Sequence, residues 1–395
     1  MARITLVVNE FDTGSETFLR RLATLLAGDG HTVTEYSLLE SRTTHQIEPG
    51  RAMALPAANS AGFPLAAAKL ATRSSKASAT AMSRATARFG RSSRAVRAAL
   101  HAAPLLATRP DVVHLSFSGI ALSLADALEL LDPQTRVIVS CRGTGELVSP
   151  VLHPERVEAL SSVLNRCDRV HAVSEAVAGA VVGMGVDRKL IRVIRPAVDT
   201  NKFSRKATYQ PIGSDSQIRV VSVGRLHWIK DFSTLLGAFG QLRDSGCEAQ
   251  LTIIGDGPEK DALQYRSFVL GLAGSVVFTG PLPPEQVREQ LEGAHLFVLS
   301  SLSEGTSNAA LEAMALELPV IVTGVGGMPE VIEDGVNGWV VPPSNPAKLA
   351  ESMTRAVSNS SLAEQIGQAG RASLAKGLTL EMQSSAIRQM YQELL

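Results

Sequence analysis

The sequence predicts an α/β protein made of two doubly wound domains, each a parallel sheet with helices on both faces. Short apolar, β-branched runs alternate with longer amphipathic stretches along almost all of the 395 residues, and this alternation is typical of βαβ units. Many of the short runs are apolar throughout, as expected for strands that are covered on both faces. The length agrees with two domains, each large enough to bury its own core.

The predicted elements come in the same alternating order in both halves of the chain. Apolar β-branched runs predict strands near residues 3–9, 32–37, 111–116, 136–140, 168–173 and 191–195, then near 217–223, 250–255, 275–279, 295–300, 319–323 and 338–341. Helical periodicity of the apolar residues predicts helices that include 16–28, 155–166, 231–244, 258–272 and 346–357.

A polar stretch at residues 203–217 separates the two sheet patterns. We therefore expect an amino-terminal domain over 1–205, a second domain over 206–375, and a last helix over 376–395 that crosses back to the first domain. Residues 41–110 are Ala-rich, basic and poor in strand signals, which predicts a helical excursion from the first domain. Because doubly wound domains bind ligands at the carboxyl ends of their strands, we expect a site in a cleft between two facing domains.

The composition excludes several classes of protein. Hydrophobic residues make up 45% and charged residues 19% of the chain, which is globular rather than disordered or fibrous. Three scattered cysteines, Cys141, Cys167 and Cys247, do not form a disulfide framework or a zinc motif. No apolar run approaches the roughly 18 residues that span a bilayer, and the first residues resemble a buried strand rather than a signal peptide. We expect a cytoplasmic protein.

The zero net charge hides a basic segment. Residues 41–110 hold eleven Lys and Arg and a single acid, Glu48, so this segment carries +10 and the rest of the chain −10. Two sets repeat at i, i+4 and i+7, on one face of a helix: Lys69, Arg73 and Lys76, then Arg84, Arg88 and Arg91. Two interpretations stay open: a solvated helical face or, over 69–97, a docking surface for anionic phospholipid or a lipid-pyrophosphate acceptor. With only Phe63 and Phe89 available for stacking, nucleic acid is not expected as a partner.

Two bases follow the first strand of the second half. The segment Ser222-Val-Gly-Arg-Leu-His-Trp-Ile-Lys-Asp231 leaves a strand through Gly224 and enters a helix near Asp231. Arg225 and Lys230 therefore stand at the carboxyl end of a strand, where a planar guanidinium and an ammonium suit a diphosphate. The alternative is a surface loop with two solvated bases.

A second cluster follows the predicted strand 295–300. Glu304 lies in the loop and Glu312 inside the next helix, whose start is marked by good capping residues, Thr306 to Asn308. The small Ala309 and Ala310 would let an anion approach the free backbone N–H groups. Alone, the two glutamates could equally be structural residues near a helix end.

Together these motifs resemble glycosyltransferase family 4. The resemblance runs over nearly all of 217–345, and its motifs are Gly224-Arg-Leu with Lys230, Gly255-Asp-Gly-Pro258, Glu304-Gly with Glu312-Ala-Met-Ala, Pro319-Val and Gly326-Gly-Met-Pro-Glu330. It implies the GT-B fold, two Rossmann-like domains facing across a cleft, and a retaining hexosyltransferase that needs neither metal nor cofactor. The phrases Gly-Arg-Leu-His-Trp and Ser-Leu-Ser-Glu-Gly resemble the branch that builds exopolysaccharides and surface glycans.

The resemblance implies a role for each matching position. Arg225 and Lys230 match the pair that holds the donor diphosphate, and Glu304 matches the glutamate that contacts the sugar hydroxyls; we take these three as catalytic. The remaining donor-binding candidates are Gly224, Ser307, Asn308, Ala309 and Ala310, through backbone amides, and Glu312, which would hold the ribose. Glu317 stands where the family commonly has glycine, and we interpret it as a surface helix end. No Asp-x-Asp occurs in the cleft segments, in agreement with metal independence.

The first domain matches the family less closely. Phe11-Asp-Thr-Gly-Ser-Glu-Thr-Phe resembles its glycine loop, with a single Gly14 as the candidate phosphate contact. Arg142 occupies the place where many members have histidine; a guanidinium is no base at neutral pH, but it can bind the acceptor or a phosphate. His114 is a second acceptor-binding candidate, although for His114 and His171 we favour structural roles.

The sequence thus predicts transfer of a sugar from a nucleotide-diphosphate sugar to a glycan or lipid-linked acceptor, in exopolysaccharide or surface-glycan biosynthesis. Three alternatives stay open: a nucleotide-sugar epimerase, a sugar phosphorylase and a non-catalytic nucleotide-sugar scaffold. A Rossmann dehydrogenase and a P-loop NTPase are excluded, because neither Gly-x-Gly-x-x-Gly after the first strand nor Gly-x-x-x-x-Gly-Lys-[Ser/Thr] is present.

Overall fold

The computed structural model describes residues 1–8, 17–38, 53–54, 75–206 and 217–395, which form two compact units. The first unit comprises Met1–Ala172, Val177–Ile194 and Ala386–Leu395, and the second comprises Val173–Ala176 and Arg195–Ser385. Residues 195–205, which the sequence assigned to the first domain, group with the second unit. The last helix, α15 (Leu380–Gln392), contributes its residues from Ala386 on to the first unit.

The first unit holds a seven-stranded parallel sheet in the order β3-β2-β1-β4-β5-β6-β7. Its strands are β1 (Arg3–Val8), β2 (Thr32–Ser37), β3 (Met53–Ala54), β4 (Val112–Leu115), β5 (Arg136–Cys141), β6 (Arg169–Ala172) and β7 (Ile191–Val193). Its helices are α1 (Thr17–Gly28), α3 (Ser75–Phe89), α4 (Ser93–Thr108), α5 (Ser118–Leu128), a short π-helix (Thr144–Val148), α6 (Ser149–Leu152), α7 (Glu155–Leu164), a short 3₁₀ turn (Arg188–Leu190) and α8 (Glu175–Gly183), which belongs to this unit from Val177 on.

The second unit holds a six-stranded parallel sheet in the order β10-β9-β8-β11-β12-β13. Its strands are β8 (Ile218–Val223), β9 (Ala249–Ile254), β10 (Val276–Gly280), β11 (Leu296–Leu299), β12 (Val320–Thr323) and β13 (Trp339–Val341). Its helices are α9 (Phe232–Asp244), α10 (Lys260–Val269), α11 (Pro284–Glu292), α12 (Asn308–Ala315), α13 (Pro346–Ser358) and α14 (Ser360–Leu374), with 3₁₀ turns at Trp228–Lys230 and Met328–Glu330.

Both sheets are doubly wound, as predicted. The strand order reverses between β1 and β4 in the first sheet and between β8 and β11 in the second sheet. The loops that leave the two strands at such a reversal turn to opposite faces of the sheet and open a crevice at its carboxyl edge, where ligands of these folds bind.

The second sheet is buried on both faces. Along β11, Leu296 and Val298 belong to one hydrophobic cluster, while Phe297 and Leu299 belong to the other. Alternate side chains of a strand point to opposite faces, so the two clusters are the cores on the two sides of the sheet. The uninterrupted apolar runs in the sequence have this cause.

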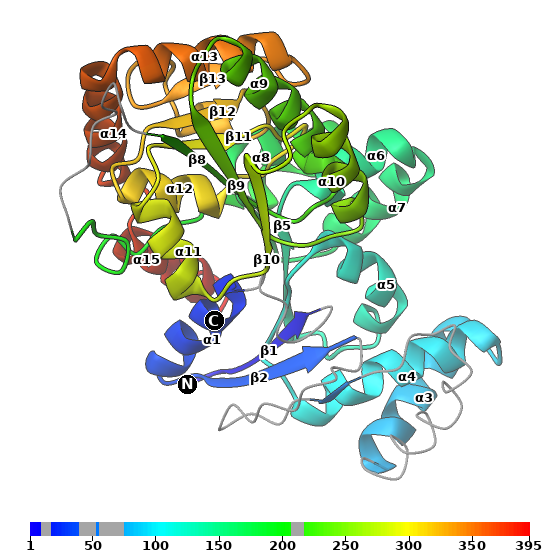
Figure 1. Ribbon diagram of the computed structural model, residues 1–395. Helices are drawn as coiled ribbons and strands as arrows, with labels where there is room; N and C mark the ends of the chain where they lie inside the picture. The colour runs from blue at the N-terminus through cyan, green and yellow to red at the C-terminus, as the bar shows by residue number, and fades with distance from the viewer. Residues whose placement is uncertain (9–16, 39–52, 55–74, 207–216) are drawn as a thin grey trace. The chain divides into compact units, whose positions relative to one another are not determined.

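The described part of the basic segment forms a helical hairpin, α3 and α4, which lie side by side in Figure 1. Buried alanines on both helices, such as Ala85 and Ala98, allow close packing. The prediction of helical excursions is confirmed there, whereas β3 is a short strand that it missed; Lys69 and Arg73 lie outside the described residues.

Three bases of the hairpin are neutralised within the first unit. Arg94 pairs with Asp126 at 2.7 Å, Arg88 with Glu129 at 2.7 Å, and Arg84 with Asp132 at 2.6 Å. The acids lie on α5 and directly after it. Part of the basic stripe therefore holds the hairpin against its own unit.

Across the described residues, no helix combines the length and the apolar character needed to cross a bilayer.

Candidate functional site

The loop after β8 carries the two bases singled out in the sequence. The Lys230 side chain runs over Gly224, where a Cβ would lie 3.5–3.6 Å from its side-chain carbons. Arg225 is exposed, and within the described ranges its guanidinium has no hydrogen-bond or ion-pair partner. Trp228, between them in sequence, is 43% exposed. At the carboxyl end of the strand the loop thus offers Lys230, packed over Gly224, and Arg225, which has no partner among the described residues.

The loop after β11 supplies the ion-pair partner of Lys230. Glu304 forms an ion pair with Lys230 and accepts a hydrogen bond from Ser301 Oγ at 2.7 Å. The Lys230 side chain is 22% exposed and that of Glu304 10%. Ser300 Oγ donates to the backbone carbonyl of Lys230 at 2.9 Å and ties the two loops together. Residues 74 positions apart meet because β8 and β11 are neighbours at the reversal of strand order.

Glycines of the remaining motifs let other loops approach these two. A Cβ at Gly326 would overlap the carbonyl oxygen of Glu304, and one at Gly327 that of Gly305. A Cβ at Gly255 would likewise overlap the Gly224 carbonyl. These glycines are needed for close backbone packing around the candidate residues.

Helix α12 begins next to Glu304. Its N-cap residue Ser307 accepts a hydrogen bond from Ala310 N–H at 3.4 Å. The N–H groups of Asn308 and Ala309 in the first turn have no acceptor in the described part of the chain. Open amides at a helix N-terminus favour an anion. Glu312 follows one turn later and is half-buried.

Two models of known protein families match this chain. A model described as "Glycosyltransferase Family 4" matches residues 13–202, and one described as "Glycosyl transferases group 1" matches residues 205–373. Between them the two models match nearly the whole chain. The chain belongs to glycosyltransferase family 4.

Two of the curated relatives have names that assign them to the biosynthesis of bacterial polysaccharides. A putative colanic acid biosynthesis glycosyltransferase of Escherichia coli, WcaL, is 28% identical over 62% of the chain and 61% of its own length. The amylovoran biosynthesis glycosyltransferase AmsK of Erwinia amylovora is 32% identical over 44% of each chain. The alignments thus span about half to three fifths of these relatives.

Solved structures show the same fold over the whole chain. Anabaena HepE, in complex with UDP and glucose, aligns with a TM-score of 0.76 at 17% identity over 100% of both chains. Sucrose-phosphate synthase of Thermosynechococcus elongatus aligns with a TM-score of 0.78 at 18% identity, over 100% of this chain and 99% of its own. Each of the two units is Rossmann-like, and the GT-B type of fold expected from the sequence is confirmed.

In the first unit, Arg142 directly follows β5. Its guanidinium lies 3.3 Å from the centroid of the Phe18 ring, a cation–π contact, and its Nε donates to the Ser116 carbonyl at 3.1 Å. Arg142 is therefore fixed at the carboxyl edge of the sheet. Gly14, the phosphate-contact candidate before Phe18, lies outside the described residues.

Glu146 lies beside Arg142 and was missed in the sequence. Its carboxyl is 3% exposed and accepts a hydrogen bond from Gly143 N–H at 2.9 Å. Burial raises its pKa, against the lowering effect of hydrogen bonds from Ser118 and the backbone. Glu146 holds the turn after Arg142. In the sequence, only the two glycines just before it, Gly143 and Gly145, indicated a tight turn at this place.

Glu330 is the last residue of the Gly-Gly-Met-Pro-Glu motif, and the sequence did not predict its role. Its carboxylate accepts hydrogen bonds from the backbone N–H groups of Glu175 at 3.0 Å and Ala176 at 2.8 Å, and pairs with Arg195 at 2.8 Å. All of these residues belong to the second unit. Glu330 therefore joins the short segment Val173–Ala176 to the start of the long segment, at Arg195, within the second unit.

His114 is part of a buried chain of hydrogen bonds. It contacts Tyr391 Oη through Nδ1 at 2.7 Å and Ser140 Oγ through Nε2 at 2.9 Å; Ser140 Oγ contacts His171 Nδ1 at 2.9 Å, and His171 Nε2 the Ile194 carbonyl at 3.0 Å. The Ile194 carbonyl can only accept, so His171 Nε2 carries the proton and His171 Nδ1 accepts from the Ser140 hydroxyl. Ser140 Oγ in turn accepts from His114 Nε2–H, and His114 Nδ1 accepts from the Tyr391 hydroxyl. Burial lowers the pKa of His171 to about 4 and that of His114 well below its usual value.

Both ring nitrogens of His114 are engaged, and the residue is 2% exposed. It therefore has no atom left for an acceptor substrate, and its assignment as an acceptor-binding residue is wrong. The structural role favoured for both histidines agrees with this geometry.

Proposed function

We propose that the chain is a retaining glycosyltransferase that transfers a hexosyl group from a nucleotide-diphosphate sugar to a glycan or lipid-linked acceptor in surface-glycan biosynthesis. The observation that carries this proposal is the set of charges at the β8/β11 reversal: the free Arg225, the Lys230–Glu304 pair and the open amides of α12. Family membership and the polysaccharide relatives support it. The UDP in the HepE complex indicates the class of nucleotide that such a fold accepts.

The charges suit the part of the donor that must leave. As the bond from the anomeric carbon to the diphosphate oxygen breaks, negative charge grows on the diphosphate, and Arg225, Lys230 and the amides of Asn308 and Ala309 neutralise it. The acceptor hydroxyl forms the new bond on the same face of the sugar and passes its proton to the leaving phosphate oxygen. Glu304 would hold the sugar hydroxyls and Glu312 the ribose.

Donor binding changes the partner of Lys230 in this proposal. In the empty site the ammonium is neutralised by Glu304, so a diphosphate competes with that carboxylate for it. Glu304 then becomes available to accept hydrogen bonds from the sugar. The ion pair keeps both partly buried side chains paired until the donor arrives.

The expectation that no metal is needed remains part of the proposal. In the described residues no group of three His, Cys, Asp or Glu side chains is placed to hold an ion. The positive groups named above supply the charge stabilisation that a metal supplies in other transferases. Activity retained in excess chelator is the corresponding measurement.

Acceptor-dependent release of UDP, GDP or ADP tests the proposal against its alternatives. A transferase releases nucleotide only when both the matching donor and an acceptor are present. An epimerase consumes donor without an acceptor, a phosphorylase requires phosphate, and a scaffold releases nothing. Arg142, fixed at the carboxyl edge of the first sheet, is the residue we propose for the acceptor side.

Cytoplasmic location and contact with an anionic membrane surface through residues 69–97 are also part of the proposal. The exposed Arg91 and Arg97 support it, because neither guanidinium forms a hydrogen bond or an ion pair in the described part of the protein. We expect Arg91→Ala/Arg97→Ala to bind vesicles of anionic lipid at least several-fold more weakly than wild type at low salt, by co-sedimentation. Equal binding to neutral and anionic vesicles would rule the contact out.

A further inference from the structure

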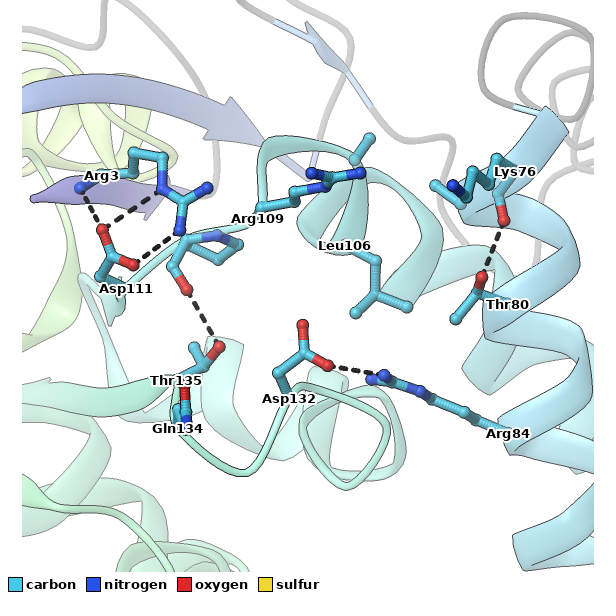
Figure 2. Close-up of a pocket in the computed structure, with 13 residues that line it drawn as sticks. Arg3, Lys76, Thr80, Arg84, Leu106, Arg109, Asp111, Asp132, Gln134 and Thr135 are labelled. Carbon is cyan, nitrogen blue, oxygen red and sulfur yellow. Dashed lines mark hydrogen bonds and ion pairs between the residues drawn. The ribbon is translucent and has the colours of Figure 1, made fainter.

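A cavity of about 650 Å³ lies in the first unit, and none of the residues proposed for the reaction lines it. Its walls come from the amino ends of the strands and from the helical hairpin (Figure 2): Arg3 opens β1, Asp111 and Thr135 precede β4 and β5, and Lys76 and Arg84 lie on α3. Arg142 follows the carboxyl end of β5. The cavity is therefore at the opposite edge of the sheet from the acceptor-side candidate.

The lining is rich in cations. It contains Arg3, Lys76, Arg84 and Arg109 against two acids, Asp111 and Asp132, so its formal charge is +2. Both acids are already occupied: Arg3 bonds Asp111 through its backbone N–H and its guanidinium, both at 2.7 Å, and Arg84 bonds Asp132 at 2.6 Å. The excess charge therefore belongs to the other two bases.

Lys76 and Arg109 are the unneutralised pair. Both are exposed, and neither side chain has a hydrogen-bond or ion-pair partner within the described ranges. Figure 2 shows the Arg109 side chain extending from the end of α4 toward the wall formed by α3. Arg109 has a left-handed φ of 45° and caps α4, its N–H donating to the Leu106 carbonyl. A long side chain is held there at a backbone position that favours glycine.

We propose that this cavity binds a phosphate monoester, with Lys76 and Arg109 as its cationic ligands. Two cations without a partner among the described residues match the two charges of a phosphate monoester, and a guanidinium presents paired donors to phosphate oxygens. The Thr80 and Thr135 hydroxyls and Gln134 line the same space and offer neutral polar groups, while Leu106 lines it beside them. A volume of this size admits a small molecule larger than phosphate alone. The ester is either a free metabolite or the headgroup of a lipid.

The test is the affinity for glycerol 3-phosphate, measured by calorimetry at low salt with the full chain. The informative variant is Lys76→Ala/Arg109→Gly, because glycine suits the left-handed φ and removes the guanidinium without backbone strain. The matched control is Arg266→Ala/Lys376→Ala, which removes the same charge from exposed positions outside both the cavity and the basic segment. Arg225→Ala controls for binding at the proposed donor site.

We expect the cavity variant to lose at least tenfold in affinity, and both controls to bind as wild type does. Acetylation of Lys76 by an amine-reactive acetylating agent, measured by mass spectrometry, should be slower when the ester is present. If the wild type binds vesicles containing phosphatidic acid but not glycerol 3-phosphate, and only the cavity variant loses this vesicle binding, the ester is a lipid headgroup. Equal affinity in the cavity variant and wild type, or an equal loss in the Arg266→Ala/Lys376→Ala control, would overturn the proposal. So would a wild type that binds neither the soluble ester nor these vesicles.

Discussion

At the scale of single residues, the loops of the candidate donor site depend on backbone positions that few residues can occupy. Gly326 combines a left-handed φ of 54° with a close approach to the Glu304 carbonyl. Glu317, interpreted from the sequence as a surface helix end, closes α12 with a left-handed φ of 57°. Leu318 N–H then bonds the Ala313 carbonyl and Glu317 N–H that of Met314, which is a Schellman cap. The glycine common at this position in the family has this conformational cause.

We predict that Gly326→Ala is much more destabilising than Gly335→Ala. Both glycines have positive φ, 54° and 73°, so each alanine costs about 1–2 kcal/mol of backbone strain. Only at Gly326 does the added Cβ meet other atoms, and relieving that overlap should cost about 1–3 kcal/mol more. Urea unfolding of both variants measures the difference. Equal losses of stability would show that the close approach to Glu304 does not constrain the loop.

At the scale of elements, helix α15 is joined to the first sheet by the directed hydrogen-bond chain from Tyr391 to Ile194. The chain crosses three neighbouring strands, through His114 on β4, Ser140 on β5 and His171 on β6. The last ten residues also pair by charge: Arg388 with Asp29 at 2.8 Å, and Glu393 with both Arg169 and Arg192. Because those ion pairs are partly exposed, the buried chain should contribute most of the polar stabilisation.

Tyr391→Phe should destabilise the protein by about 1–3 kcal/mol, because it removes the donor to a buried ring nitrogen of His114. Tyr36→Phe is the matched control. Tyr36 is 2% exposed, yet its hydroxyl has no hydrogen-bond partner among the described residues, so its removal should be close to neutral. Thermal and urea unfolding would compare the two. A Tyr391→Phe variant as stable as Tyr36→Phe would contradict the assigned chain of donors.

At the scale of the whole molecule, the sequence predicted what depends on pattern and missed what depends on contacts. Apolar runs and helical periodicity gave the two doubly wound units, because parallel sheets with both faces buried require them. The pairing of Lys230 with Glu304 followed from strand order and was not visible in the spacing. The buried roles of Glu146 and Glu330 depend on which backbone N–H groups the fold brings to them, and the ion pairs of Arg84, Arg88 and Arg94 depend on the packing of the hairpin.

The most direct test of the central claim, that Arg225 neutralises charge on the departing diphosphate, is the rate of acceptor-dependent nucleotide release by Arg225→Ala. Arg266→Ala is the control, since Arg266 is an exposed base on α10 of the same unit. Loss of a preorganised donor to a developing anion predicts a decrease in turnover on the order of 10²–10³-fold for Arg225→Ala, and an unchanged rate for the control. Full turnover by Arg225→Ala would contradict the account.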